Sequence, residues 1–267
     1  MPKENFNGQV IWITGASSGI GEALAKQFAK LGAQVVLSAR REEELKRVAR
    51  QLENSEQHMI LPLDVTDYAS LTATYGEVIQ KKGRLDCLIN NAGVSQRALI
   101  CDTLDHTDRQ IMEIDYFAPV ALTRVVLPSM LKQGSGHVVF ISSVAGLLGT
   151  QYRASYAAAK GAIHLWANSL RAELADQGLQ VSVIFPGFVK TNVSVAALKG
   201  NGEELGTMDD AQANAMSSDE FAEQAVQALL AGREYIVIGG LKEKVGVWLS
   251  RLYPPLMYRM IRKSKVR

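Results

Sequence analysis

The sequence predicts a single α/β domain: a doubly wound parallel sheet of about seven strands with helices on both faces. Two observations carry this prediction. Short apolar runs alternate along the chain with longer segments of helical periodicity, and the runs are continuously apolar rather than alternating in polarity. Continuously apolar strands are covered on both faces, and repeated β–α alternation requires parallel strands joined by right-handed crossovers. A length of 267 residues fits one domain of ordinary size.

The first half of the chain supplies four of the expected strands. Each is an apolar run followed by a longer helical pattern, and the fourth pattern contains Pro119, which marks a break or a helix start. The expected strands are residues 10–14, 35–39, 59–63 and 85–90. The helices that follow them are expected at residues 22–31, 42–52, 67–82 and 105–130.

The second half supplies three more strands, at residues 138–142, 181–185 and 235–238, with helices at 154–177 and 221–230. The least regular stretch is 192–218, which contains three glycines and little periodicity. It follows the sixth strand and therefore emerges at the carboxyl edge of the sheet, where such folds bind ligands. We expect a mobile substrate lid there; a plain surface excursion is the alternative.

Composition excludes several classes of function. A net charge of +2 is too small to indicate nucleic-acid binding, and 47% hydrophobic residues suffice for a sizeable core. Cys87 lies in an apolar run and is expected to be buried and reduced, so it forms no disulfide framework with Cys101. The four histidines have no cysteine or histidine partner at ligand spacing, so no metal is expected.

No targeting or membrane-spanning signal is expected. Residues 1–8 contain no apolar core of a signal peptide, and the chain has no run of about 18 apolar residues. These observations predict a cytoplasmic protein.

A glycine-rich turn follows the first expected strand, at Thr14–Gly21. Its three glycines allow positive φ angles and let a phosphate approach the backbone, while the helix that follows offers unpaired N–H groups. Strand-to-helix turns often use glycine for structural reasons alone, but the position in the first β–α unit favours a dinucleotide site of the Rossmann type. The residues expected to hold the pyrophosphate are Gly15, Ser17, Ser18, Gly19, Ile20 and Gly21.

The end of the second expected strand indicates which dinucleotide binds. A site for NAD usually offers a carboxylate there, whereas this chain has Ser38, Ala39, Arg40 and Arg41, with no acid before Glu42. Two guanidinium groups suit a 2′-phosphate, so NADP(H) is favoured. The alternative is that both arginines are merely solvated at a helix start, where cations oppose the helix dipole.

Three residues suggest carbonyl chemistry. Tyr156 and Lys160 are four apart in a helical pattern, so they project from one face, and Ser143 precedes them at the end of the fifth strand. A carbonyl that is being reduced needs a proton donor as the hydride arrives, and a nearby ammonium makes a tyrosine hydroxyl release its proton more readily. Ser143 can donate a hydrogen bond to the substrate oxygen. Tyrosine and lysine at this spacing are common on ordinary helices, so the motif gains weight only with the others.

Taken in order, these motifs resemble the short-chain dehydrogenase/reductase family over residues 8–240, and most closely its microsomal-type NADPH-dependent reductases. The resemblance implies that Tyr156 is the acid/base and that Lys160 both tunes it and holds the nicotinamide ribose. It implies that Asp64 and Val65 contact the adenine, and that Asn91, Ala92 and Gly93, in the run 90–93, steady the sheet beside the cofactor. Pro186, Gly187, Val189 and Thr191 would flank the nicotinamide.

The chain departs from the family at Asp115, where the family usually has an asparagine that carries a proton relay to the lysine. An aspartate keeps the acceptor oxygen but loses the donor. We expect Asp115 to act in the relay; a purely structural role is the alternative.

The expected body, residues 1–241, is followed by a basic amphipathic segment, 242–267. This segment has eight basic residues against Glu243 and thus a net charge of +7, which leaves −5 for the rest of the chain. Apolar residues recur in it close to helical spacing, with a break at Pro254–Pro255. Such a segment suits peripheral contact with an anionic membrane surface; packing on the body or across a dimer is the alternative.

The expected function is an NADP(H)-dependent oxidoreductase that transfers hydride between NADPH and a carbonyl or secondary alcohol. A non-catalytic NADPH-binding scaffold and an NAD-dependent alcohol dehydrogenase are the alternatives. Leu147, Leu148, Gln151, Phe188 and the 192–218 segment are expected to shape an apolar pocket for a hydrophobic small molecule. The family resemblance implies a homodimer or homotetramer, often formed through the helix that carries Tyr156.

Overall fold

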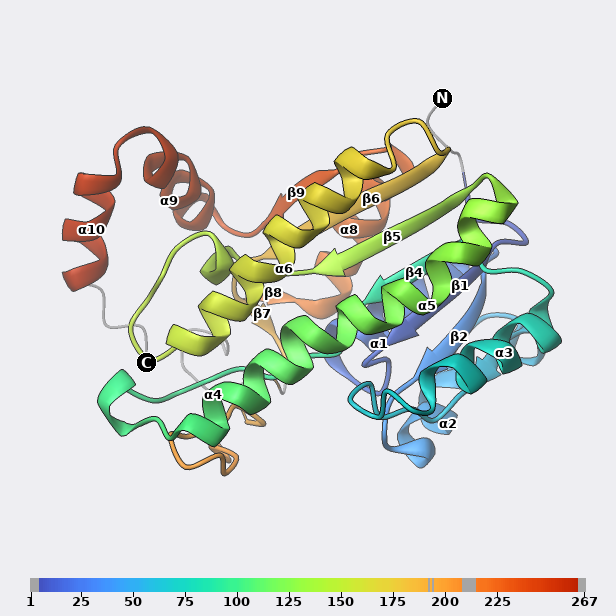
Figure 1. The fold of residues 1–267 in the computed structure, drawn as a ribbon, viewed down its shortest axis with the longest axis horizontal. Helices are drawn as coiled ribbons and strands as arrows, with labels where there is room; N and C mark the ends of the chain where they lie inside the picture. The colour runs from blue at the N-terminus through green and yellow to red at the C-terminus, as the bar shows by residue number, and fades with distance from the viewer. Residues whose placement is uncertain (1–4, 192, 194, 208–214, 264–267) are drawn as a thin grey trace.

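The computed structural model shows one seven-stranded parallel sheet between two layers of helices (Figure 1). It describes the whole chain except residues 1–4, 192, 194, 208–214 and 264–267. The strand order is β3-β2-β1-β4-β5-β6-β9, which confirms the doubly wound sheet. The strands are β1 (Val10–Thr14), β2 (Gln34–Ser38), β3 (Met59–Ile60), β4 (Cys87–Asn90), β5 (Gly136–Ile141), β6 (Leu179–Pro186) and β9 (Tyr235–Ile238).

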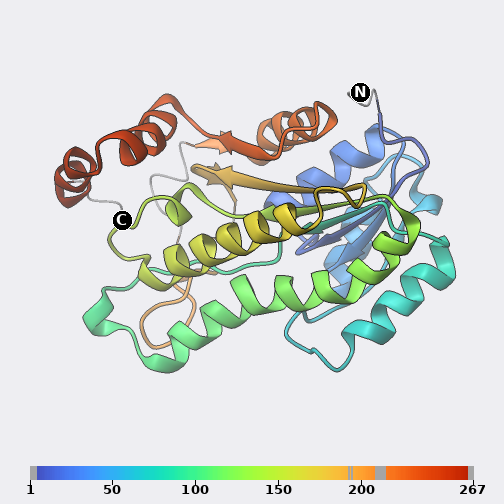
Figure 2. The same cartoon turned by 45° about the horizontal axis from the view of Figure 1, so that its top comes forward.

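Alternate side chains of a strand pack into hydrophobic clusters on opposite faces of the sheet. In β1, Ile11 and Ile13 pack under α1 (Gly19–Lys30), α2 (Glu42–Ala49) and α8 (Ser218–Leu230). Val10 and Trp12 face the other layer, made by α3 (Leu71–Lys82), α5 (Ala118–Gln133) and α6 (Ala154–Glu173). The tilted view in Figure 2 shows the sheet between these layers. Both faces are therefore covered, which explains why the strands read as continuously apolar.

Some expected element boundaries were wrong. Helix α1 begins at Gly19 rather than at residue 22, α3 begins at Leu71 rather than 67, α2 ends at Ala49 rather than 52, and α6 ends at Glu173 rather than 177. The strand expected at 59–63 is only two residues long. A separate two-stranded sheet, β7 (Val189–Lys190) with β8 (Met216–Ser217), was not expected.

The helix expected at 105–130 has three parts. They are α4 (Asp105–Met112), one π-helical turn at Glu113–Phe117 and α5, with Pro119 in the first turn of α5. By length and composition alone, this whole stretch is long and apolar enough to cross a membrane. No helix of that kind was expected from the sequence. In the fold, Val120, Leu122, Val126 and Met130 of this stretch are buried in the core cluster against the sheet, which accounts for their apolar character.

The described part of the 192–218 segment folds back onto the chain after β4. The Leu198 N–H donates to the Ser95 carbonyl at 2.8 Å, and the Gly200 carbonyl accepts hydrogen bonds from the Leu104 N–H and the Thr107 hydroxyl. Leu198 is buried. This part is therefore hydrogen-bonded to the body of the protein. A role as a substrate lid stays a prediction, with the surface excursion as its alternative, and residues 192, 194 and 208–214 lie outside the described residues.

The C-terminal segment forms two helices, α9 (Leu241–Leu252) and α10 (Pro254–Lys263), separated at the expected Pro254 break. Both lie beside the carboxyl edge of the sheet (Figure 1). Cys87 is buried, as expected, and Cys101 is exposed; both are free.

Candidate active site

The glycine-rich turn connects β1 directly to α1. Gly15 and Gly19 have φ angles of +67° and +59°. A side chain at Gly21 could not be accommodated, because its Cβ would lie 2.2 Å from the Gly15 carbonyl oxygen. The residue before α1, Ser18, gives the helix no side-chain cap. The first N–H groups of α1 thus face the turn with a positive dipole end, which fits an anionic group such as a pyrophosphate.

Asn91 fixes the position of this turn from the end of β4. Its side-chain N–H₂ donates to the carbonyl oxygens of Thr14 and Gly15, at 2.9 and 3.2 Å. The Thr14 hydroxyl in turn accepts from the N–H groups of Asn91 and Ala92. The tight approach of Gly15 to Ala92 makes the two β-strand ends one rigid edge.

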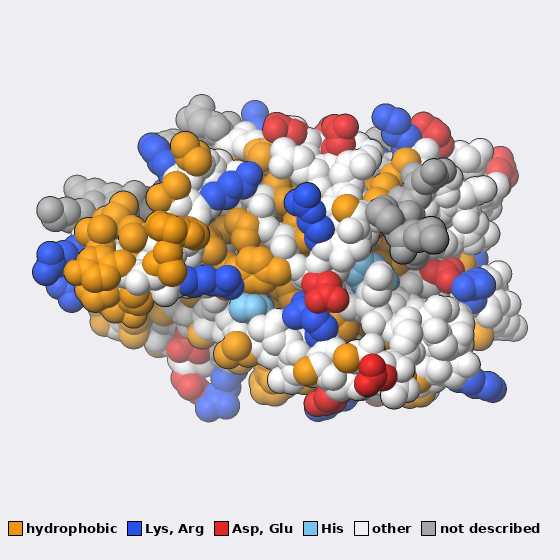
Figure 3. Space-filling view, turned by 90° about the horizontal axis from the view of Figure 1, so that it is seen from above, with side chains coloured by type: hydrophobic (Ala, Val, Ile, Leu, Met, Phe, Trp, Pro, Cys, Tyr) orange, Lys and Arg blue, Asp and Glu red, His pale blue; other side chains and the backbone are white. Residues whose placement is uncertain are grey.

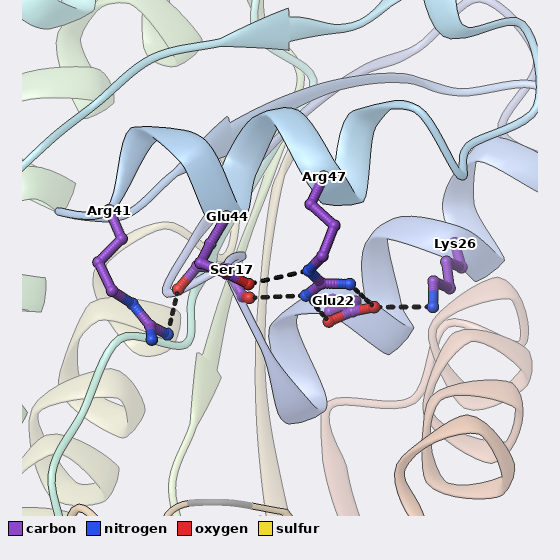
Figure 4. A network of polar contacts seen from close by, with 6 residues as sticks. All are labelled: Ser17, Glu22, Lys26, Arg41, Glu44 and Arg47. Carbon is purple, nitrogen blue, oxygen red and sulfur yellow. Dashed lines mark hydrogen bonds and ion pairs between the residues drawn. The ribbon is translucent and has the colours of Figure 1, made fainter.

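A network of charged residues holds the outer side of the turn (Figure 4). Arg41 donates to the Ser17 hydroxyl at 3.3 Å. Arg47 donates to the Ser17 carbonyl and makes two hydrogen bonds to Glu22, which also pairs with Lys26. The hydrogen bond from Arg47, opposed by burial, holds the pKa of Glu22 below its usual range.

Sequence reasoning missed Arg47 and Glu22 because neither belongs to a motif. The helical pattern alone placed them on separate helices, and only the packing of α1 beside α2 brings them together. Arg40 is exposed and lies close enough to Asp64 for its charge to act on that carboxyl. Hydrogen bonds from Thr66, assisted by the charge of Arg40, lower the pKa of Asp64.

The buried side chain of Lys160 lies where α6, the end of β5 and the π-helical turn Glu113–Phe117 meet. Its Nζ donates to the Ile141 carbonyl at 3.1 Å and lies 3.5 Å from Asp115 Oδ2 and 5.8 Å from the centre of the Tyr156 ring. Ser143 lies at the end of β5, where its hydroxyl accepts from the Ala145 N–H at 3.1 Å. The short 3-10 turn Val144–Gly146 after it packs on the backbone of Lys160. The structure therefore brings the four expected residues to one edge of the sheet.

The π-helical turn at Glu113–Phe117 presents Asp115 to Lys160. One carboxylate oxygen, Oδ1, accepts from the Val94 N–H at 2.8 Å, while Oδ2 accepts no hydrogen bond in the described part of the chain. Burial raises the pKa of the Asp115 carboxyl, although the Lys160 charge opposes the rise. Turns of this kind recur at functional sites because they re-aim one side chain within a helix.

Two positioning residues near Tyr156 were also missed. The buried Gln96 accepts hydrogen bonds from the Ser155 and Tyr156 N–H groups at the start of α6, at 2.9 and 3.4 Å. Ser142 donates to the Lys160 carbonyl at 2.8 Å. Neither stands at a spacing that a motif specifies, so only the folded contacts reveal them.

The segment after β6 passes over the glycine turn. Thr191 lies against Gly19, where a Cβ would be 3.1 Å from the Thr191 methyl. Pro186 belongs to β6, the Gly187 N–H donates to Ile238, and Val189 is buried in β7. These contacts bring the expected cofactor-flanking residues to the same edge as the glycine turn.

A groove of about 470 Å³ opens beside the start of α6. It is lined by Leu99, Ile100, Cys101, Thr150, Gln151, Tyr152 and Ala154. Of the expected pocket residues, Gln151 lines this groove. Leu148 does not, because it is buried in the core near α9, and Phe188 lies under the Arg153 guanidinium.

Comparison with known proteins agrees with this geometry. The family model for short chain dehydrogenase matches residues 9–201. Dehydrogenase/reductase SDR family protein 7-like from Drosophila melanogaster is 40% identical over 99% of this chain and 83% of its own length. Dehydrogenase/reductase SDR family member 7B from Danio rerio is 37% identical over 97% of this chain and 86% of its own length.

Solved structures show the same fold. A short-chain dehydrogenase from Streptomyces avermitilis superposes with a TM-score of 0.79 at 27% identity, over 96% of this chain and 98% of that one. A short-chain dehydrogenase/reductase from Burkholderia phymatum, solved in complex with NAD, has a TM-score of 0.84 at 24% identity, over 94% and 96% of the two chains.

Proposed function

The chain belongs to the short-chain dehydrogenase family, and we propose that it is an NADPH-dependent carbonyl reductase that also works in reverse as an alcohol dehydrogenase. The observation that carries the proposal is that Lys160 lies beside Tyr156 and against the turn that follows Ser143, at the sheet edge where the uncapped α1 begins. When bound, the nicotinamide supplies the hydride. The protein's part is to bind and orient the two reactants and to move one proton.

Tyr156 is the proposed proton donor to the carbonyl oxygen. Lys160, fixed by Ile141 and Asp115, places a positive charge near the Tyr156 ring, and this charge stabilises the phenolate left after transfer. The Ser143 hydroxyl, oriented by the Ala145 N–H, has its own proton free to donate to the same carbonyl oxygen.

Asp115 is the proposed member of a proton relay to Lys160. Its Oδ2 faces the ammonium at 3.5 Å without a hydrogen bond among the described residues, so it has acceptor capacity for a proton-carrying group. Oδ1 is already engaged by Val94, which fixes the carboxylate in this orientation.

The preference for NADPH is proposed from the rim of the glycine turn. Arg40 and Arg41 are exposed at the end of β2, and Arg41 reaches the Ser17 hydroxyl. The acids of α2, Glu42 to Glu44, lie in its first turn, where Lys46 and Arg47 pair with them. The rim therefore offers cations to a 2′-phosphate, which a guanidinium binds well.

The test is reduction of hydrophobic ketones with NADPH by wild type and by Tyr156→Phe. Loss of the proton donor should lower kcat/KM by about 10²–10⁴-fold while NADPH affinity stays within about threefold. Equal turnover by both proteins would refute the role of Tyr156. NADPH binding without turnover in wild type would favour the scaffold function instead, and faster turnover with NADH would favour the NAD-dependent dehydrogenase.

A further inference from the structure

Helices α9 and α10 each have an inner face that the fold already uses. Val247 and Met257 are buried in the same core cluster as Leu148. The helices meet the body closely at Gly246, where a Cβ would lie 3.5 Å from Leu148 and 3.7 Å from Met257. The inner face therefore accounts for the attachment of both helices to the sheet.

The outer face is also apolar, yet it is exposed. On α9 the exposed large apolar residues are Leu241, Val245, Trp248 and Leu252, which are 78%, 49%, 64% and 61% exposed. Their spacing of four, three and four residues places them in one stripe along the helix. The exposed apolar side chains continue with Tyr253, between the two helices, and with Leu256, Tyr258 and Met260 on α10. We refer to these eight side chains as the outer patch.

Basic side chains surround the outer patch. Figure 3 shows apolar side chains gathered at the end of the molecule formed by α9 and α10, with Lys and Arg side chains at their margin. The exposed cations of these helices include Lys242, Lys244, Arg259 and Arg262. The one acid, Glu243, turns inward against Gly187 and Gly240. The surface is thus both apolar and positive, with no acid pointing outward from the described part of α9 and α10.

We propose that the outer patch docks on a lipid bilayer that contains anionic lipids. Aliphatic residues with Trp and Tyr, flanked by Lys and Arg, suit the boundary between acyl chains and negative headgroups. A second copy of the chain fits less well, because charged residues are depleted at the centre of protein interfaces and two such surfaces would bring like charges together. Charge complementarity therefore selects the bilayer as the occupant.

The location of the patch suggests what docking achieves, a consequence that rests on the proposed function. The groove is lined by Leu99–Cys101, Thr150–Tyr152 and Ala154. The backbone segments that carry these residues lie at the same end of the molecule as α10 (Figures 1 and 2). Ile100 and Leu99, at its rim, are 78% and 42% exposed. A bilayer held by the outer patch would therefore lie at the end of the molecule where this groove opens, which we take as the entrance for a hydrophobic carbonyl substrate.

The test measures binding of the full chain, without cofactor, to phosphatidylcholine vesicles with and without phosphatidylserine. Co-sedimentation should be strong only with phosphatidylserine and should weaken in high salt. The double variant Trp248→Ser/Leu252→Ser and the variant Lys242→Glu/Lys244→Glu should each lower the partition coefficient by about tenfold or more. The matched controls Leu131→Ser and Lys132→Glu, on exposed positions of α5, should bind as wild type does.

Each outcome decides the proposal separately from the enzyme activity. Absence of wild-type binding to the phosphatidylserine vesicles, or equal binding by the patch variants, would overturn it. So would a wild-type dimer that becomes monomeric in Trp248→Ser/Leu252→Ser, measured by light scattering, if vesicle binding is absent. Turnover of a water-soluble ketone by the patch variants should equal that of wild type, so loss of catalysis in all proteins would refute the proposed function and not the docking surface.

Discussion

Arg41 is the exposed side chain to which we assign the proposed preference for NADPH. It lies at the start of α2 and donates to Ser17 in the glycine turn, so its guanidinium is held at the rim of the turn. We predict that Arg41→Asp weakens NADPH binding by about 10–100-fold, because it replaces a charge-assisted hydrogen bond with repulsion, and leaves NADH binding within about threefold. Fluorescence titration with both nucleotides measures the two changes.

The control for this prediction is Arg50→Asp, which reverses a charge at the other end of the same helix. It should change neither affinity by more than about threefold, because screening weakens charges at that distance. A loss of NADPH affinity as large as that of Arg41→Asp would mean that the general positive field, and not the contact at the turn, provides the preference.

At Asp115 the sign of the pKa shift gives a second prediction. Burial raises the pKa of this carboxyl, so Asp115 takes up a proton at a higher pH than an exposed aspartate does. Asp115→Asn keeps the acceptor and cannot titrate. We predict that kcat at neutral pH stays within about threefold of wild type or rises, and that the variant retains more of its activity than wild type as the pH falls. A kcat profile against pH checks both.

The same shift makes a stability prediction with the sign fixed by proton linkage. A carboxyl whose folded pKa lies above its ordinary value of 3.8 favours the fold below that value, and this contribution is lost as the pH rises through the folded pKa. The free energy of unfolding of wild type relative to Asp115→Asn should therefore decrease from acidic to neutral pH. Denaturant unfolding at several pH values measures this; a difference that grows with pH would contradict the direction of the shift.

At the level of elements, the position of Lys160 depends on how closely the turn after Ser143 approaches α6. A Cβ at Gly146 would lie 2.7 Å from the Lys160 carbonyl carbon. Gly146→Ala must therefore displace the turn or the helix, and we predict a fall in kcat of about 10–100-fold with NADPH affinity within about threefold. Gly149→Ala, where a Cβ meets nothing within 4 Å, is the matched control and should keep wild-type kinetics. Equal kcat in both variants would show that the close approach does not position the catalytic residues.

The elements also show how far the sequence could predict this fold. All seven strands of the main sheet were predicted, because continuous burial leaves a direct record in apolar runs such as Val10–Thr14. The start of α1 was placed too late because glycines disfavour a helix in general. Yet two glycines lie in its first turn: Gly19 has a positive φ angle, and a Cβ at Gly21 would meet the carbonyl oxygen of Gly15.

Features that depend on contacts between distant segments were not predictable. The π-helical turn that presents Asp115 has no periodic signature, and the two-residue strands β7 and β8 are too short to show one. Gln96 became visible only when the fold brought its side chain to the start of α6. The reactive residues, and Asp115 and Asn91 beside them, were predicted from spacing and family resemblance, whereas Gln96 and Ser142 were found only in the structure.

For the molecule as a whole, the question is whether the C-terminal helices belong to the body or only lie beside it. The inner and outer faces of α9 and α10 allow this to be measured, since Met257 is 9% exposed and Trp248 is 64% exposed. We predict that Met257→Ala lowers the free energy of unfolding by about 2 kcal/mol, at the lower end for a buried methionine because the site lies at the edge of the core. Trp248→Ser should change it by less than about 0.5 kcal/mol, as an exposed substitution does.

Denaturant unfolding of the two variants, followed by both fluorescence and circular dichroism, tests this contrast. Coincident transitions with a lower midpoint for Met257→Ala would show that α9 and α10 unfold together with the sheet. An unchanged midpoint would mean that the helices detach before the body unfolds. The stability of the core around Leu148 would then not depend on them. The outer patch can attach the body to a bilayer only if the inner face of the two helices stays packed on the body. The proposed docking surface therefore depends on the core contacts of Val247 and Met257.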